Sequence, residues 1–174
     1  MKIKFSSSLI LIGLISSVLL TMATAQRTPT FAPYSVPVEK ATAKKINFAS
    51  HPKAKKFRTE LSEALETGQV DFAGKYIVAS WGCGSGCTQS ALIDATTGNV
   101  YFPVNLWEVI AGGMAAGERD LLEYKENSRL MIITGYQRKR KQDSTMSMHG
   151  VSFYEWTGRD FKLLKFIKRP VKKY

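Results

Sequence analysis

Residues 76–102 read YIVASWGCGSGCTQSALIDATTGNVYF, and this stretch decides the fold. Two runs rich in apolar and β-branched residues, 76–81 and 89–94, flank a glycine-rich segment that contains both cysteines of the chain. The turn sequence ATTG then leads into a third run at 99–102. Runs of this length between Gly, Asp and Thr are typical of β-strands. The stretch therefore predicts three consecutive strands joined by short turns.

The same pattern recurs twice toward the C-terminus. Predicted strands at 121–124 and 129–136 flank the turn KENS, and predicted strands at 151–156 and 161–167 flank the turn TGRD. Polar residues at 139–150 predict an exposed loop, and the glycines within 105–118 are compatible with either a short helix or a mobile loop.

One amphipathic helix is predicted ahead of the strands, at 51–67. Ala54, Phe57, Leu61 and Leu65 recur at helical spacing. Ser50 is the expected N-cap and Gly68 the expected C-terminal stop. The predicted fold class is therefore α+β, an antiparallel β-meander with one N-terminal helix packed on it, in a single domain at 46–174.

The N-terminus has the features of a Sec-type signal peptide at 1–25. Lys2 and Lys4 precede a mostly apolar run at 8–20, and the sequence Ala-Thr-Ala at 23–25 matches a small-x-small cleavage site. The apolar run is too short for a stable transmembrane helix. We therefore expect a periplasmic or secreted protein with no stable membrane insertion. Three prolines in residues 27–38 predict that 26–45 form an extended arm or linker.

The chain is strongly basic. Its formal net charge is +11, and removal of the two leader lysines leaves +9. A candidate anion patch comprises Arg138, Lys139, Arg140, Lys141, Lys168 and Arg169. An exported basic protein could bind an anionic envelope polymer or an acidic protein. These cations could instead form a solvated face that maintains solubility.

Cys83 and Cys87 are most simply a disulfide, because an exported chain matures in an oxidising compartment. A redox-active dithiol and a metal site are the alternatives. The reactive spacing is usually Cys-x-x-Cys, and a zinc site needs about four ligands, whereas this chain has two histidines. A disulfide would close a candidate binding loop that could present backbone N–H groups to an anion. The loop residues are Trp81, Gly82, Gly84, Ser85, Gly86 and Thr88.

Three motifs resemble those of a family of small, uncharacterised exported bacterial proteins. They are HPKAKKFRTEL, DFAGKYIVASWGCGSGC and ALIDATTGNVYF, within residues 48–102. The Phe-Ala-Gly-x-Tyr and Trp-Gly-Cys-Gly-x-x-Cys patterns are the most specific parts. The resemblance implies an exported, β-rich domain and supplies no catalytic residues.

No catalytic set can be assembled from these residues without special assumptions. A nucleophilic Cys87 would need His149 as its base, and a disulfide would prevent this. Asp71, Asp94 and Glu108 are the candidate carboxylates, although Asp94 opens a turn in which aspartate normally bonds its own backbone. No metal or cofactor is expected. The sequence thus favours an exported binding protein of the cell envelope, with a small thiol-dependent or redox-active envelope enzyme as the alternative.

Overall fold

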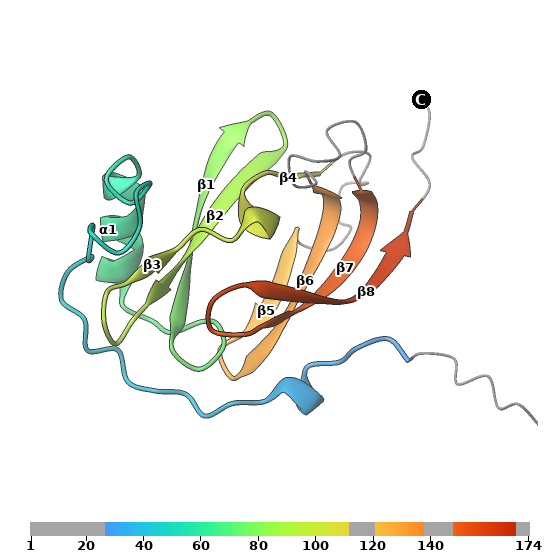
Figure 1. Ribbon diagram of the computed structural model, residues 1–174, viewed down its shortest axis with the longest axis horizontal. Coiled ribbons are helices and arrows are strands. Elements are labelled where there is room, and N and C mark those ends of the chain that lie inside the picture. The colour runs from blue at the N-terminus through green and yellow to red at the C-terminus, as the bar shows by residue number, and fades with distance from the viewer. Residues whose placement is uncertain (1–26, 112–120, 138–147, 170–174) are drawn as a thin grey trace, which may run out of the picture.

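A computed structural model describes residues 27–111, 121–137 and 148–169 of the 174-residue chain. The fold is α+β, as predicted: one α-helix packs against an eight-stranded antiparallel sheet (Figure 1). Within the described ranges no helix has the length and apolar character of a membrane span. The predicted signal peptide and residues 138–141 of the candidate anion patch lie outside these ranges.

The sheet consists of two meanders. Its main order is β1-β2-β4-β6-β7-β8, with β3 paired to β2 and β5 paired to β6. The predicted strands all form, some of them longer than expected. Their bounds are β1 Tyr76–Gly84, β2 Cys87–Asp94, β3 Val100–Tyr101, β4 Val109–Ile110, β5 Leu122–Lys125, β6 Ser128–Gln137, β7 Met148–Trp156 and β8 Phe161–Lys168.

The short strand β4 joins the two meanders into one sheet. Val109 and Ile110 pair with β2 on one side and with Gln137 and Tyr136 of β6 on the other. Sequence reasoning offered only a short helix or a loop for this region. The described part instead contains a 3-10 turn, η2 (Val104–Leu106), followed by β4. Two paired residues are too few to give a recognisable alternation of apolar and polar side chains.

The helix is shorter than predicted. α1 spans Arg58–Thr67, and residues 52–57 form turns, so the predicted start at residue 51 is wrong. Ser50 is not the N-cap, because its hydroxyl accepts the Val100 N–H at 2.9 Å and donates to the Asn47 carbonyl at 2.6 Å. This residue therefore joins the preceding segment to β3. Gly68 ends the helix in the left-handed conformation at φ 68°, as predicted.

The β1–β2 hairpin is buried on both faces. Ile77 and Ala79 of β1 pack toward α1 in one core cluster, whereas Tyr76 and Val78 pack into a second cluster with residues of the other meander. Burial on both faces explains why these strands are apolar runs without alternation. The second cluster contains Phe72, Leu92, Leu106, Val109, Met131, Ile133, Tyr154 and Trp156.

Apart from a 3-10 turn, η1 (Ala32–Tyr34), the N-terminal arm is extended, and it contacts both meanders (Figure 1). The Val36 N–H donates to the Asn127 carbonyl at 2.9 Å, and the Glu39 N–H donates to the Gly74 carbonyl at 2.7 Å. Farther along, the N–H groups of Thr42 and Ala43 both donate to the Ala95 carbonyl at 2.9 Å. Phe31 and Tyr34 pack against a third core cluster, which comprises Leu130, Ile132, Val151 and Phe153. The outer face of β6 and β7 is thereby covered.

Asp71 caps the free edge of β1. Its Oδ1 atom accepts the Val78 N–H at 2.9 Å, and its own N–H donates to the Tyr76 carbonyl at 3.0 Å. Burial raises the pKa of Asp71 to about 6, against the opposing effect of hydrogen bonds to its carboxylate from the backbone N–H groups of Val78 and of Asp71 itself. The carboxyl group therefore takes up a proton more readily in the folded chain than in the unfolded chain.

This difference predicts a pH dependence of stability. Between about pH 4 and 6 the folded state binds more protons at Asp71 than the unfolded state, so the free energy of unfolding falls as pH rises. Asp71→Asn keeps an oxygen for Val78 and removes this contribution, which amounts to up to about 3 kcal/mol. Urea unfolding of both proteins at pH 4–7 measures the difference. Glu63→Gln, which removes an exposed carboxyl group of α1, is the control. Identical pH profiles for the wild type and Asp71→Asn would contradict the assignment.

Candidate functional site

The predicted disulfide is present at the tip of the β1–β2 hairpin. Cys83 and Cys87 are bonded, with 5.1 Å between their Cα atoms. Strand pairing continues past Gly82 opposite Thr88 to Gly84 opposite Cys87, and a bulge between Gly82 and Gly84 leaves Cys83 out of register. We call residues 81–88 the tip loop. The disulfide closes this loop across the last residues of the two strands.

The tip loop presents backbone rather than side chains. Residues 82–86 are all exposed, whereas Trp81, Cys87 and Thr88 are half-buried. A Cβ atom added at Gly82 or Gly84 would have no heavy atom within 4 Å. Gly84 and Gly86 have φ angles of 138° and 64°, which side chains disfavour. Peptide groups of the loop are thus accessible to a partner.

Trp81 connects the tip loop to the core. Its ring stacks on Phe57 with 4.7 Å between centroids, and its Nε1 atom donates to Gln89 Oε1 at 3.1 Å. Phe102 and Trp107 complete an aromatic cluster, with ring centroids 5.8 and 5.7 Å from Phe57. Phe57 is buried, whereas the other three rings are half-buried. The cluster gives the exposed loop a rigid base.

Sequence reasoning identified Trp81 but missed the rest of this cluster. Phe57, Phe102 and Trp107 come from three other segments, and no local pattern relates them to Trp81. The Lys53 ammonium group lies 3.4 Å from the centroid of the Trp107 ring, a cation–π arrangement. The cluster therefore already carries a positive charge at its surface.

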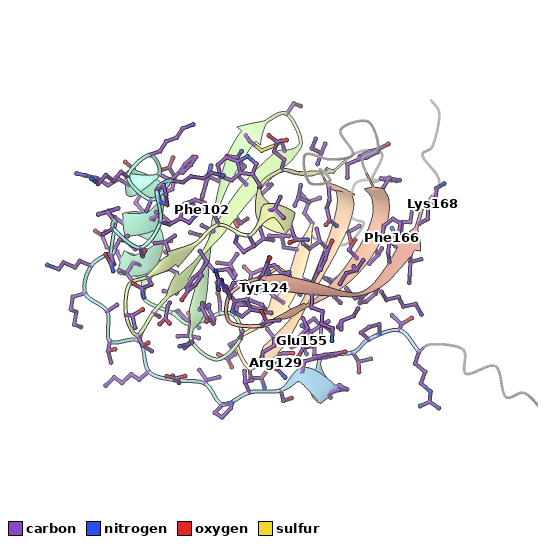
Figure 2. All side chains as sticks on the ribbon, in the orientation of Figure 1. Phe102, Tyr124, Arg129, Glu155, Phe166 and Lys168 are labelled. Atoms are coloured by element: carbon purple, nitrogen blue, oxygen red, sulfur yellow. A yellow bond between two sulfur atoms is a disulfide. The ribbon has the colours of Figure 1, made fainter. Side chains whose placement is uncertain are left out.

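A groove of about 480 Å³ adjoins the cluster at Phe102, which is labelled in Figure 2. His51 lies in its wall, with its ring centroid 4.7 Å from that of Phe102. Burial, followed by the charge of Lys53, lowers the pKa of His51. Its Nδ1 atom accepts the Lys53 N–H at 3.1 Å, so the neutral ring carries its proton on Nε2. Arg159 and Asp160 also line the groove.

The structure does not bring His149 to Cys87. His149 lies within β7 rather than in an exposed loop, so the predicted loop ends before Met148. In register across the sheet, Cys87 lies opposite Ile110, Ile110 opposite Tyr136, and Tyr136 opposite His149. Cys87 and His149 are therefore three strands apart. With about 4.8 Å between neighbouring strands, the distance between their backbones is about 14 Å across the sheet. The structure therefore does not assemble this nucleophile–base pair.

Two of the candidate carboxylates, Asp94 and Asp71, have local structural roles. Asp94 Oδ1 accepts the N–H and the hydroxyl of Thr96 at 2.9 and 2.6 Å, and Lys75 Nζ lies 3.0 Å from Oδ2. Burial alone would raise the pKa of Asp94, but the hydrogen bonds from Thr96 and Lys75 outweigh it and lower the pKa. This confirms the predicted turn role. Asp71 caps β1, and Glu108 lies between η2 and β4.

Neither a metal cluster nor a complete anion patch can be assembled from the described residues. Residues 27–111, 121–137 and 148–169 contain no group of three or more His, Cys, Asp or Glu side chains placed to hold a metal ion. Of the candidate anion patch, the structure places Lys168 at the end of β8 and Arg169 directly after it. Lys168 is exposed, and Arg169 is half-buried.

Comparisons with known proteins identify no match. No protein-family model, no curated protein and no solved structure matches this chain. Function must therefore be inferred from the geometry of the tip loop and its surroundings.

Removal of the disulfide should have a small effect on stability. A bond that closes so short a loop contributes about 2 kcal/mol by the chain-entropy model. We expect the double variant Cys83→Ser/Cys87→Ser to remain folded and to lose about that amount in urea unfolding. Ser85→Ala, in the same loop, is the control. A loss of about 4 kcal/mol or more would mean that the disulfide stabilises the whole sheet.

Proposed function

We propose that this chain is an exported binding protein of the cell envelope, with the tip loop as its recognition site. The observation that carries the proposal is the form of the loop, an exposed glycine backbone closed by a disulfide and supported by Trp81. The signal-peptide pattern and the resemblance described above support export.

A loop of this kind suits binding, because it is ordered before a ligand arrives. Ordering a flexible loop on association costs free energy, and a cross-link reduces that cost. The open space around Gly82 and Gly84 allows a ligand to approach the peptide groups closely. Half-buried aromatic side chains beside the loop add contact area that loses little conformational entropy.

The charge near the site favours an anionic ligand. Lys53, Lys55, Lys56 and Arg58 are exposed in and beside the first turn of α1. Lys53 lies over Trp107, and Lys56 Nζ lies 5.4 Å from the centroid of the Phe57 ring. We infer that the ligand is a phosphate-bearing envelope polymer, with the cations at 138–141, Lys168 and Arg169 assisting its approach.

Binding to poly(glycerol phosphate), a polymer with one phosphate per unit, tests the proposal, with uncharged dextran as the control polymer. We expect calorimetry to detect binding that weakens as salt rises, because screening reduces charge attraction. Gly82→Ala adds a methyl group in open space at a position without positive φ, so the fold should persist. This variant should bind at least tenfold more weakly, since the methyl group obstructs the backbone.

Lys55→Ala is the matched control for charge, and it should change the affinity less than threefold. If Lys55→Ala and Gly82→Ala lost affinity equally, the binding would reflect general charge attraction. That result would contradict a binding site at the tip loop. Failure to bind poly(glycerol phosphate), or equal binding of dextran, would overturn the inference that the ligand is anionic.

A redox function is the second candidate, because Cys83 is exposed on the tip loop. Equilibration with glutathione buffers, followed by alkylation and mass measurement, gives the reduction potential of the Cys83–Cys87 pair. A structural disulfide should have a reduction potential below about −300 mV, whereas exchange catalysts lie between about −270 and about −120 mV. If the chain is a binding protein, we expect the reduction potential of the Cys83–Cys87 pair to be below about −300 mV.

A further inference from the structure

The two ends of the sheet differ in how their free edges are protected. β1 and β8 are the terminal strands of the sheet. At β1, the Asp71 carboxylate accepts the outward Val78 N–H, and the N–H groups of Asp71 and Phe72 both donate to the Tyr76 carbonyl. The first half of this edge therefore has partners within the chain.

β8 has no such cap among the described residues. Each of its pairings is with β7. The Arg169 N–H donates to the His149 carbonyl at 3.0 Å, so these two residues form a hydrogen-bonded pair. This pair determines which residues in the regular half of β8 direct their backbone groups toward β7. In an antiparallel ladder, the residues between hydrogen-bonded pairs direct their N–H and C=O groups to the other side. Phe166 and Lys168 therefore direct their backbone groups toward the free edge.

Apolar side chains flank this edge on both faces of the sheet. Leu163 and Ile167 are 47% and 38% exposed. Leu163 lies opposite Tyr154, which belongs to the second core cluster, and Ile167 lies opposite Val151, which belongs to the third. Figure 2 shows Phe166 and Lys168 on this outermost strand. Beyond residue 165, an added strand would contact Ile167 on one face and the half-buried Phe166 on the other.

The charges at the edge favour an acidic partner. Lys162 and Lys168 are exposed on β8, and Arg169 follows directly. Glu155 lies opposite Lys162, but its Oε1 atom is 2.6 Å from Arg129 Nη1, so its charge is already paired (Figure 2). A second copy of β8 would bring lysines against lysines, and like charges on adjacent strands are destabilising. The edge thus disfavours self-association and suits a negatively charged chain.

We propose that the free edge of β8, from Lys165 to Arg169, binds an extended acidic segment of a partner protein by adding it to the sheet as a further strand. The main-chain groups of Phe166 and Lys168 provide the hydrogen bonds, and the exposed cations select acidic side chains. A register shift between Phe153 and Tyr154 separates this half of β8 from the half that contains Leu163. The bound segment is therefore short.

A labelled eight-residue peptide of alternating Glu and Val tests this proposal by fluorescence anisotropy with the purified protein. The decisive pair of variants is Lys168→Ala and Lys168→Pro. Both remove one charge, but only proline also removes an N–H that faces the free edge. We expect alanine to weaken binding less than threefold and proline to weaken it at least tenfold. Gly82→Ala should bind the peptide unchanged, because the tip loop is a separate site.

Four further outcomes decide the matter. Equal losses in Lys168→Ala and Lys168→Pro, or equal binding of a Lys–Val peptide, would overturn strand addition to β8. A peptide N-methylated at alternate residues should bind the wild type at least tenfold more weakly, which tests the hydrogen bonds without altering the protein. A dimer that forms as the protein concentration rises, and that Lys168→Pro abolishes, would assign the edge to a second copy instead.

Discussion

Burial of the β1–β2 hairpin on both faces is the constraint on which the rest of the structure depends. One face packs on α1 and the other on the second meander, so each covering layer is held through contacts with this hairpin. Strands that are covered on both sides must be apolar throughout, and residues 76–79 and 91–93 meet that requirement. Beyond Trp81 the hairpin leaves the core, and its sequence changes to glycine, serine and cysteine. The exposed tip loop is therefore the continuation of the most buried element.

Much of the fold could be predicted because turn residues mark its strands. Gly98 and Gly158 lie in turns with positive φ, and the runs between such turns have β-forming composition. The helix start could not be predicted, because Ser50 can cap a helix or bond to another segment, and only tertiary structure decides between them. β4 was missed because its two residues pair with strands distant in the sequence.

Of the candidate site, only the disulfide between Cys83 and Cys87 could be predicted from the sequence. Two cysteines four residues apart in an oxidising compartment already indicate a loop-closing bond. The aromatic cluster depends on contacts between side chains up to 50 residues apart, from Phe57 to Trp107, which no local pattern encodes. His149 was assigned to a loop because its neighbours are polar, yet pairing with Tyr136 places it in β7. Pairing within a sheet, rather than local polarity, determines the position of such a residue.

The extended arm has a consequence for the order in which the molecule assembles. Its hydrogen-bond partners are Gly74, Ala95 and Asn127, and Ser128 donates its hydroxyl proton to the Phe31 carbonyl at 3.1 Å. The arm emerges from the ribosome before all of these residues, and contacts between distant parts of a chain form slowly. This early segment is therefore among the last to dock. Until β7 has been made, through residue 156, the outer face of β6 and β7 does not exist, and Phe31 and Tyr34 stay exposed to any factor that binds nascent chains.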